Sequence, residues 1–116
     1  MTKEYTINAA GKKLGRISSE IAKILMGKTS AQFQNHVVAP VTVRVENASK
    51  LDMTEKKRTQ EVRKRYSGYP GGQKVEKLGE YISRKDSGHA IKLAVKRMLP
   101  NNRLLTARLK NLIITE

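Results

Sequence analysis

In the first half of the chain, the spacing of hydrophobic residues changes from that of a strand to that of a helix and then back to that of a strand. Residues 5–9 predict a short strand that ends at a turn around Gly11. Valine alternates with polar residues over 41–46, which predicts a second strand. Between these strands, apolar residues recur at the three- and four-residue spacing of an amphipathic helix, with Gly27 placed to cap its end. The residues on this helical face are Leu14, Ile17, Ile21, Ile24 and Leu25.

The second half begins with an irregular stretch and then turns helical. From residue 50 to residue 77 few apolar residues occur, and we expect one short strand somewhere in Thr59–Tyr66. The order strand, helix, strand at the start favours a right-handed parallel crossover, and therefore an α/β sandwich. The elements expected after residue 77 are a short helix from Leu78 that stops near Ser87, a helix over 91–99 that ends at Pro100, a helix that begins near Asn102, and a final strand over 113–115.

Charge is the feature of the composition that changes the picture most. The 116 residues include 24 Lys and Arg against 10 Asp and Glu, which gives a net charge of +14. A charge so far from zero destabilises a compact domain by self-repulsion, so we expect a polyanionic partner. The hydrophobic content of 38% suits one core, and we predict a single domain over residues 1–116.

Other features of the composition exclude some classes of protein. The chain has no Cys, which excludes disulfides and thiolate metal sites. The N-terminus lacks the apolar stretch of a signal peptide, and no segment reaches the roughly 18–20 apolar residues of a membrane span. We therefore expect a soluble protein of the cytoplasm, or of an organelle matrix, with no membrane partner and no small-molecule substrate.

The segment from Arg63 to Lys74 carries the most specific chemistry. Two tyrosines and three glycines lie among cations, and no acidic residue occurs between Glu61 and Glu76. Glycine lets the backbone approach a partner closely, tyrosine rings can stack on bases, and Lys and Arg can bind phosphates. We predict a basic RNA-binding loop over about residues 56–77.

Three other motifs have simpler interpretations. Residues 22–29 match a relaxed phosphate-loop pattern, but this motif must open a helix, and here it closes one. The segment 11–16 lies between a strand and a helix, where its basic residues suit either a plain turn or an RNA phosphate. The two histidines, His36 and His89, have no neighbouring ligands at metal-site spacing. No catalytic grouping stands out, so we predict that the chain is not an enzyme and has no cofactor.

Four segments in order carry a resemblance to a known family. They are Leu14–Ala22 with Leu25–Lys28, Val43–Ala48, Tyr66–Lys74, which contains a Ser-Gly-Tyr-Pro-Gly-Gly run, and Ala94–Asn102. On these residues the chain resembles the bacterial-type large-subunit (50S) ribosomal protein thirteen family over nearly its whole length. It departs from the family at Tyr66, where His is usual, and at Leu105, where Gly is usual.

The resemblance implies a fold and a function. The fold is a three-layer α/β sandwich with a small, mostly parallel four-stranded sheet flanked by helices. The function is that of a structural constituent of the large ribosomal subunit, which binds large-subunit ribosomal RNA, supports its assembly and lies beside neighbouring large-subunit proteins. The family's RNA-facing positions correspond to Lys57, Tyr66–Gly72, Lys74 and the basic residues around 98–103.

The motifs and the resemblance together define the predicted RNA-binding residues. These are Lys12, Lys13, Arg16, Lys56, Lys57, Arg58, Arg63, Lys64, Arg65, Tyr66, Ser67, Gly68, Tyr69, Pro70, Gly71, Gly72, Lys74, Lys96, Arg97, Asn101, Asn102 and Arg103. Two alternatives stay open. The same surface would suit a free RNA-binding regulator of translation, and the pattern ending in Gly27-Lys28-Thr29 would suit a nucleotide-dependent enzyme.

Overall fold

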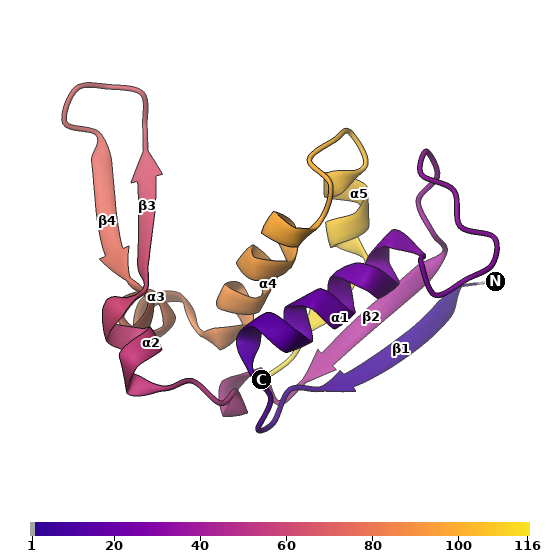
Figure 1. Cartoon of the computed structure of the whole chain (residues 1–116), viewed down its shortest axis with the longest axis horizontal. Coiled ribbons are helices and arrows are strands. Elements are labelled where there is room, and N and C mark those ends of the chain that lie inside the picture. Colours follow the sequence, from indigo (N-terminus) through magenta and orange to yellow (C-terminus); the bar gives the residue numbers. More distant parts are fainter. Residues whose placement is uncertain (1) are drawn as a thin grey trace.

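A parallel three-stranded sheet organises the chain, and the computed structural model describes residues 2–116 (Figure 1). Strand β1 (Lys3–Asn8), helix α1 (Leu14–Met26) and strand β2 (Val41–Glu46) confirm the predicted strand, helix, strand order. The two strands are parallel, with Lys3 opposite Val41 and Asn8 opposite Glu46. Strand β5 (Leu112–Ile114) pairs with the other edge of β2, also in parallel, so β2 is the central strand.

The two faces of this sheet have different surroundings. The valines of β2 at positions 41, 43 and 45 are buried, while Arg44 and Glu46, which point the other way, are exposed. Helix α1 and helix α4 (Ser87–Met98) pack together, and their buried residues join the valines in one core. The exposed face carries polar contacts such as the Arg44 Nε to Glu4 Oε1 hydrogen bond of 3.1 Å. Within residues 2–116 the sheet is therefore covered by helices on one face, so the body has two layers where three were predicted.

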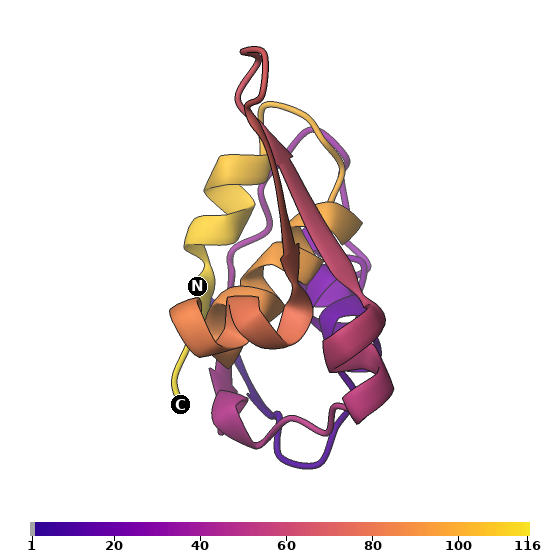
Figure 2. The ribbon, with the colours of Figure 1, turned by 90° about the vertical axis from the view of Figure 1, so that its left-hand side faces the viewer.

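The predicted four-stranded sheet is wrong because the third strand pairs elsewhere. Strand β3 (Val62–Tyr66) forms an antiparallel hairpin with strand β4 (Gln73–Lys77), apart from the main sheet. The hairpin projects from the body in both views (Figure 2). The radius of gyration is consequently 15.3 Å, whereas a compact chain of this length would have about 13 Å. A strand in Thr59–Tyr66 was predicted correctly, but its partner was not.

Helix α1 ends as its sequence predicts. Its apolar face is buried, and Gly27 caps it in the left-handed conformation with φ of 85°. A Cβ atom on Gly27 would lie 2.8 Å from the Cβ of Ala39, so the connection to β2 also requires glycine here. Since Lys28 and Thr29 follow the helix, its N–H groups do not point at them. The geometry rejects the phosphate-loop interpretation.

The remaining helices correct several predicted boundaries. A 3₁₀ turn η1 (Ala48–Lys50) and helix α2 (Glu55–Gln60) lie in the stretch predicted to be irregular. Helix α3 (Leu78–Lys85) is followed at once by α4, which begins earlier than predicted because Asp86 caps it by accepting a hydrogen bond from the His89 N–H. Helix α5 (Leu105–Lys110) begins three residues later than predicted and ends before Leu112, which belongs to β5.

Two clusters of buried residues hold these elements together. The larger one lies between the sheet and helices α1 and α4. The smaller one consists of Leu78, Tyr81 and Ala90 and lies between α3 and α4, near the base of the hairpin. One charged residue, Arg108 of α5, is also buried, and its Nη2 donates to the Asn35 carbonyl over 3.4 Å. Helix α5 thereby contacts the long connection between α1 and β2.

Candidate nucleic-acid interface

The end of the hairpin, Ser67–Gly72, presents the most specific motif of the sequence to solvent (Figure 1). Gly68 and Gly71 have φ values of 92° and 72°, a region that side chains disfavour, so the turn depends on glycine at both positions. The Gly72 N–H donates to the Tyr69 carbonyl over 2.9 Å and closes the turn. The loop is thus an ordered feature of the fold, which we call the hairpin tip.

Both tyrosines at this end of the hairpin are open to solvent. Tyr66, at the end of β3, is 68% exposed and Tyr69 in the tip is 75% exposed. Exposed aromatic rings cost free energy in water and offer flat faces on which bases can stack. The exposed cations Lys64, Arg65 and Lys74 lie on the adjacent strands. Rings and cations therefore occur together at the end of the molecule that is furthest from its core.

The base of the hairpin is held to the body by charged contacts. The Arg63 guanidinium lies 4.2 Å from the centre of the Tyr81 ring, in cation–π geometry. Opposite Arg63 in the register, Glu76 accepts two hydrogen bonds from Arg84, each of 3.0 Å. These hydrogen bonds lower the pKa of Glu76. Of the predicted RNA-binding residues in the hairpin, Arg63 is therefore already in contact with another part of the chain, the Tyr81 ring.

Helix α2 places three further predicted residues next to this base. Thr54 caps the helix by accepting from the Lys57 N–H over 3.2 Å. Lys56 and Arg58 are exposed, while Lys57 is half-buried and lies 3.7 Å from a carboxylate oxygen of Glu61. Helix α2 packs against α3 and β4. Its free cations therefore extend the basic surface of the hairpin toward the body.

The end of α4 and the connection to α5 form a second basic region. Lys96, Arg97 and Asn101 line a hollow of about 390 Å³. Arg97 also lines a small hollow of about 50 Å³ that reaches Val62 and Arg63 at the base of the hairpin. The connection from α4 to α5, with exposed Asn102 and Arg103, lies on the same side of the molecule as the hairpin tip in both views (Figures 1 and 2).

The third predicted group lies elsewhere. Lys12, Lys13 and Arg16 are exposed around the turn between β1 and α1, on the opposite side of the body from the hairpin tip (Figure 1). Lys13 pairs with the Asp52 carboxylate, and the Asp52 N–H donates to the Lys12 carbonyl over 3.0 Å. The structure thus groups the hairpin with the end of α4, and it separates both from this turn.

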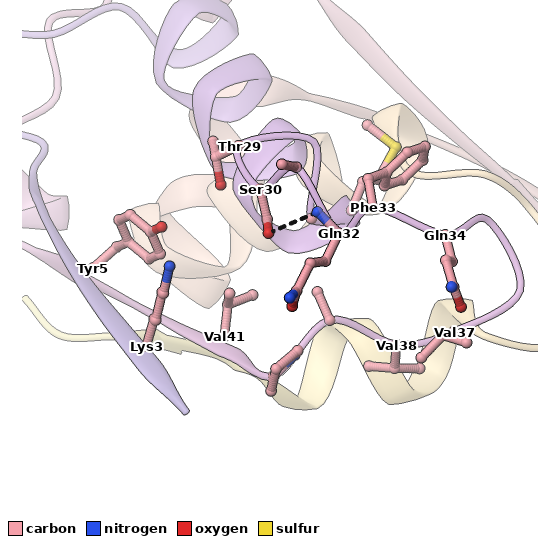
Figure 3. Close-up of a pocket in the computed structure, with 15 residues that line it drawn as sticks. Lys3, Tyr5, Thr29, Ser30, Gln32, Phe33, Gln34, Val37, Val38 and Val41 are labelled. Carbon is pink, nitrogen blue, oxygen red and sulfur yellow. Dashed lines mark hydrogen bonds between the residues drawn. The ribbon is translucent and has the colours of Figure 1, made fainter. Parts of the chain in front are cut away.

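Sequence reasoning missed a hollow at the end of the molecule away from the hairpin. The connection between α1 and β2, residues 27–40, lies over the start of β1 and borders an open pocket of about 660 Å³ (Figure 3). Its lining includes Lys3, Tyr5, Gln32 and Phe33. Residues 21–45 contain no acidic residue, but nothing local in the sequence marks the pocket itself.

Residues 2–116 contain no group of three or more His, Cys, Asp or Glu side chains arranged to hold a metal ion. His89 instead lies 2.9 Å from Asp86 through its Nδ1 atom. Over the same residues, every helix is too short or too polar to cross a membrane.

Comparison with known proteins identifies the family. The family model described as ribosomal protein L13 matches residues 2–115. The large ribosomal subunit protein uL13 of Natranaerobius thermophilus is 49% identical over 110 residues, which are 95% of this chain and 76% of the relative. The proteins of the same name from Symbiobacterium thermophilum and Staphylococcus carnosus are 45% and 41% identical, over 88% and 97% of this chain and 71% and 77% of theirs. The resemblance drawn from the four motifs is confirmed, and the chain belongs to the ribosomal protein L13 family.

Proposed function

We propose that this chain is a structural constituent of the large ribosomal subunit, which binds large-subunit ribosomal RNA mainly through the hairpin tip and the end of α4. It acts in the cytoplasm, where it supports assembly of the subunit beside neighbouring large-subunit proteins. The relatives named large ribosomal subunit protein uL13 support this function. Membership of a ribosomal protein family also agrees with the prediction that the chain is not an enzyme.

The observation that carries the proposal is the exposure of Tyr66 and Tyr69 beside free cations at the hairpin tip. Neither ring belongs to either cluster of buried residues, so the fold gains little from them. RNA bases or sugars would stack on these exposed rings, and Lys64, Arg65 and Lys74 would meet the phosphates. RNA would also neutralise part of the net charge of +14.

Electrostatics alone would give binding to any RNA. Such binding falls with salt in proportion to the number of phosphates contacted. The hairpin tip adds a shape that charge does not supply, because Gly68 between the two tyrosines and Gly71 after Tyr69 both have positive φ and fix the path of the backbone. We therefore expect the chain to prefer its ribosomal RNA domain over an unrelated duplex at moderate salt.

A competition experiment tests this function. The full chain is bound to a labelled fragment of large-subunit ribosomal RNA and challenged with an excess of unrelated duplex RNA. Tyr69→Ala should weaken binding by about 5- to 150-fold, since one stacked base contributes about 1–3 kcal/mol. Tyr69→Phe is the matched control, because it keeps the ring, and it should bind almost as tightly as the original chain.

Two results would contradict the proposal. One is equal competition by any RNA, and the other is unchanged affinity of Tyr69→Ala for the ribosomal fragment. The alternative function, a free regulator of translation, is separated by sedimentation of a cell lysate. A pool of the chain that is mostly free of ribosomes would favour the regulator.

A further inference from the structure

The open hollow between residues 27–40 and the start of β1 has the dimensions of a ligand site. Its volume of about 660 Å³ falls within the range of about 300–1,000 Å³ that is usual for pockets holding small molecules or cofactors. The floor comes from the first residues of β1 and β2, and the connection from α1 forms the opposite wall (Figure 3). The Arg108 hydrogen bond to the Asn35 carbonyl ties this connection to α5.

The lining combines flat or apolar walls with polar groups. Tyr5 and Phe33 contribute aromatic rings, and residues such as Val38 and Val41 contribute apolar surface. The polar ends of Lys3, Tyr5 and Gln32 are directed into the same space (Figure 3). The Gln32 backbone N–H donates to Ser30 Oγ over 3.2 Å, which fixes the turn that carries the Gln32 side chain.

Three polar side chains of this pocket are free to bind a ligand. Within residues 2–116, no hydrogen bond of the fold involves the Lys3 ammonium, the Tyr5 hydroxyl or the Gln32 side-chain amide. An amide that can both donate and accept suits the edge of a nucleobase, whose groups do the same. A hydrophobic ligand without polar edges would leave these groups unsatisfied.

The charge around the pocket favours a polyanion over a protein segment rich in cations. Residues 21–45 contain no Asp or Glu. Lys3 lines the pocket, and exposed Lys28 directly follows Gly27, which also lines it. The carbonyl end of the α1 dipole lies at this wall and disfavours a phosphate inside the pocket. A neutral group inside the pocket and a phosphate against Lys28 outside it would satisfy both conditions.

We propose that this pocket receives one unstacked nucleobase of ribosomal RNA. The base lies against the Phe33 ring, the Gln32 amide and the Lys3 ammonium bond its edge, and Lys28 outside the pocket meets a flanking phosphate. The proposal rests on the proposed function, which it extends to a second RNA site. The hairpin and this pocket lie at opposite ends of the long axis (Figure 1), along which the chain extends 45 Å. The chain would therefore connect two separate segments of the RNA.

The first test places a reporter in the pocket. The chain has no Trp, so Phe33→Trp gives a single indole whose fluorescence is quenched when a base stacks on it. The probes are short single-stranded RNA oligomers and the same sequences as duplexes. We expect quenching by the single strands and almost none by the duplexes, whose bases are already stacked. Gln32→Ala in the same background should weaken the quenching affinity by about tenfold, while Gln60→Ala, a matched change on α2, should not.

The controls separate this proposal from the proposed function. Tyr69→Ala in the Phe33→Trp background removes a ring at the other end of the molecule, so it should leave the quenching unchanged. If Tyr69→Ala bound the ribosomal RNA fragment as tightly as the original chain, that result would contradict RNA binding by the hairpin tip but not by the pocket. Absence of quenching by every RNA, with the Tyr69 effect intact, would overturn the pocket proposal alone. Quenching by acidic peptides but not by RNA would also overturn it, in favour of a protein partner.

A second measurement keeps the proposal testable should Phe33→Trp disturb the fold. The unaltered chain is irradiated with RNA that contains 4-thiouridine, and the crosslinked peptides are mapped by mass. We expect crosslinks in residues 29–34 or at Tyr5, in addition to those at the hairpin tip. Crosslinks confined to the hairpin and α4 would contradict a second site.

Discussion

The hairpin and the parallel sheet are built from strands of similar length but are stabilised differently. In β2, Val43 and Val45 are 0% exposed, whereas Val62 of β3 and Val75 of β4 are 44% and 59% exposed. The sheet is held by burial of apolar surface against α1 and α4, while an isolated two-stranded hairpin is marginal in water. The hairpin therefore depends on its attachment at the base and, in our account, on the RNA that it binds.

This difference shows how one small chain can combine a stable fold with a large charged surface. The apolar residues that the sequence supplies are concentrated in the body, where they outweigh the repulsion among its cations. The hairpin contributes little to the core and can present its rings and cations without loss to the fold. Substitutions should thus affect stability in the body and RNA binding in the hairpin, and the following experiments test that separation.

The largest contrast is expected between two tyrosines. Tyr81 is buried with Leu78 and Ala90 beneath the Arg63 guanidinium, so Tyr81→Ala should lower the free energy of unfolding by about 3 kcal/mol. Tyr69→Ala, the same change at the hairpin tip, should alter it by less than about 0.5 kcal/mol. Urea unfolding followed by circular dichroism measures both. Equal losses would mean that the tip contributes to the fold.

A second contrast uses valine in the two kinds of strand. Val43→Ala removes two methyl groups from the core and should cost about 2 kcal/mol, including the cavity that it leaves. Val75→Ala changes an exposed side chain of β4 and should cost less than about 0.5 kcal/mol. The same unfolding assay applies to both variants. A cost at Val75 that matched the one at Val43 would show that the exposed face of the hairpin is covered in solution.

A third contrast divides two arginines of β3. Arg63→Ala removes the cation over Tyr81 and should lower stability by about 0.5–1 kcal/mol. Arg65→Ala should leave stability unchanged. It should reduce the dependence of log K on log salt by about 0.7–0.9 for RNA binding, as expected for one lost phosphate contact. Titrations at several salt concentrations give this slope. If Arg63→Ala changed the salt dependence of RNA binding more than Arg65→Ala did, Arg63 and not Arg65 would be the residue that contacts a phosphate.

The smallest effects concern pH and lie at the two ends of α3. Hydrogen bonds from His89 lower the pKa of Asp86, and those from Arg84 lower the pKa of Glu76. A carboxyl whose pKa is lower in the folded chain binds fewer protons there than in the unfolded chain, so its contribution is present at neutral pH. That contribution declines as the pH falls through the ordinary carboxyl pKa and is lost below the folded value.

Asp86→Asn and Glu76→Gln should therefore destabilise the chain slightly at pH 7. The difference from the original chain should shrink as the pH falls below about 4, near the ordinary pKa of these carboxyls. Asp and Asn have side chains of nearly the same size and shape, so the positive φ of 106° at position 86 strains both alike and backbone strain should not obscure the result. A difference that stayed constant from pH 7 to pH 3 would contradict this origin.

The sequence predicts the body well because apolar periodicity and burial coincide there. The spacing of Leu14, Ile17 and Ile21 identifies α1, and the alternating valines identify β2. Helix α2 escaped prediction because it buries no residue, although the Thr54 cap followed by Glu55 was an available signal. Strand β4 has one apolar residue, Val75, which is exposed, so no alternation marks it.

The arrangement of the candidate site was harder to predict from the sequence than the residues that form it. The motif around Tyr69 was recognised from rings, glycines and cations, but the antiparallel pairing that lifts it from the body was not. The predicted four-stranded sheet failed for a physical reason: β3 has no buried face with which to join a sheet packed on a core. The pocket near Tyr5 depends on how residues 27–40 fold over two strands, a long-range contact without a local signal.

In our proposal the hairpin tip faces ribosomal RNA, while the body alone maintains the fold. A density map of a large ribosomal subunit that contains this chain tests it most directly. We predict that the rings of Tyr66 and Tyr69 lie against RNA bases or sugars, with α1 and α4 packed on the sheet as they are here. A map in which the hairpin tip points into open solvent, or in which the subunit lacks this chain, would contradict the account.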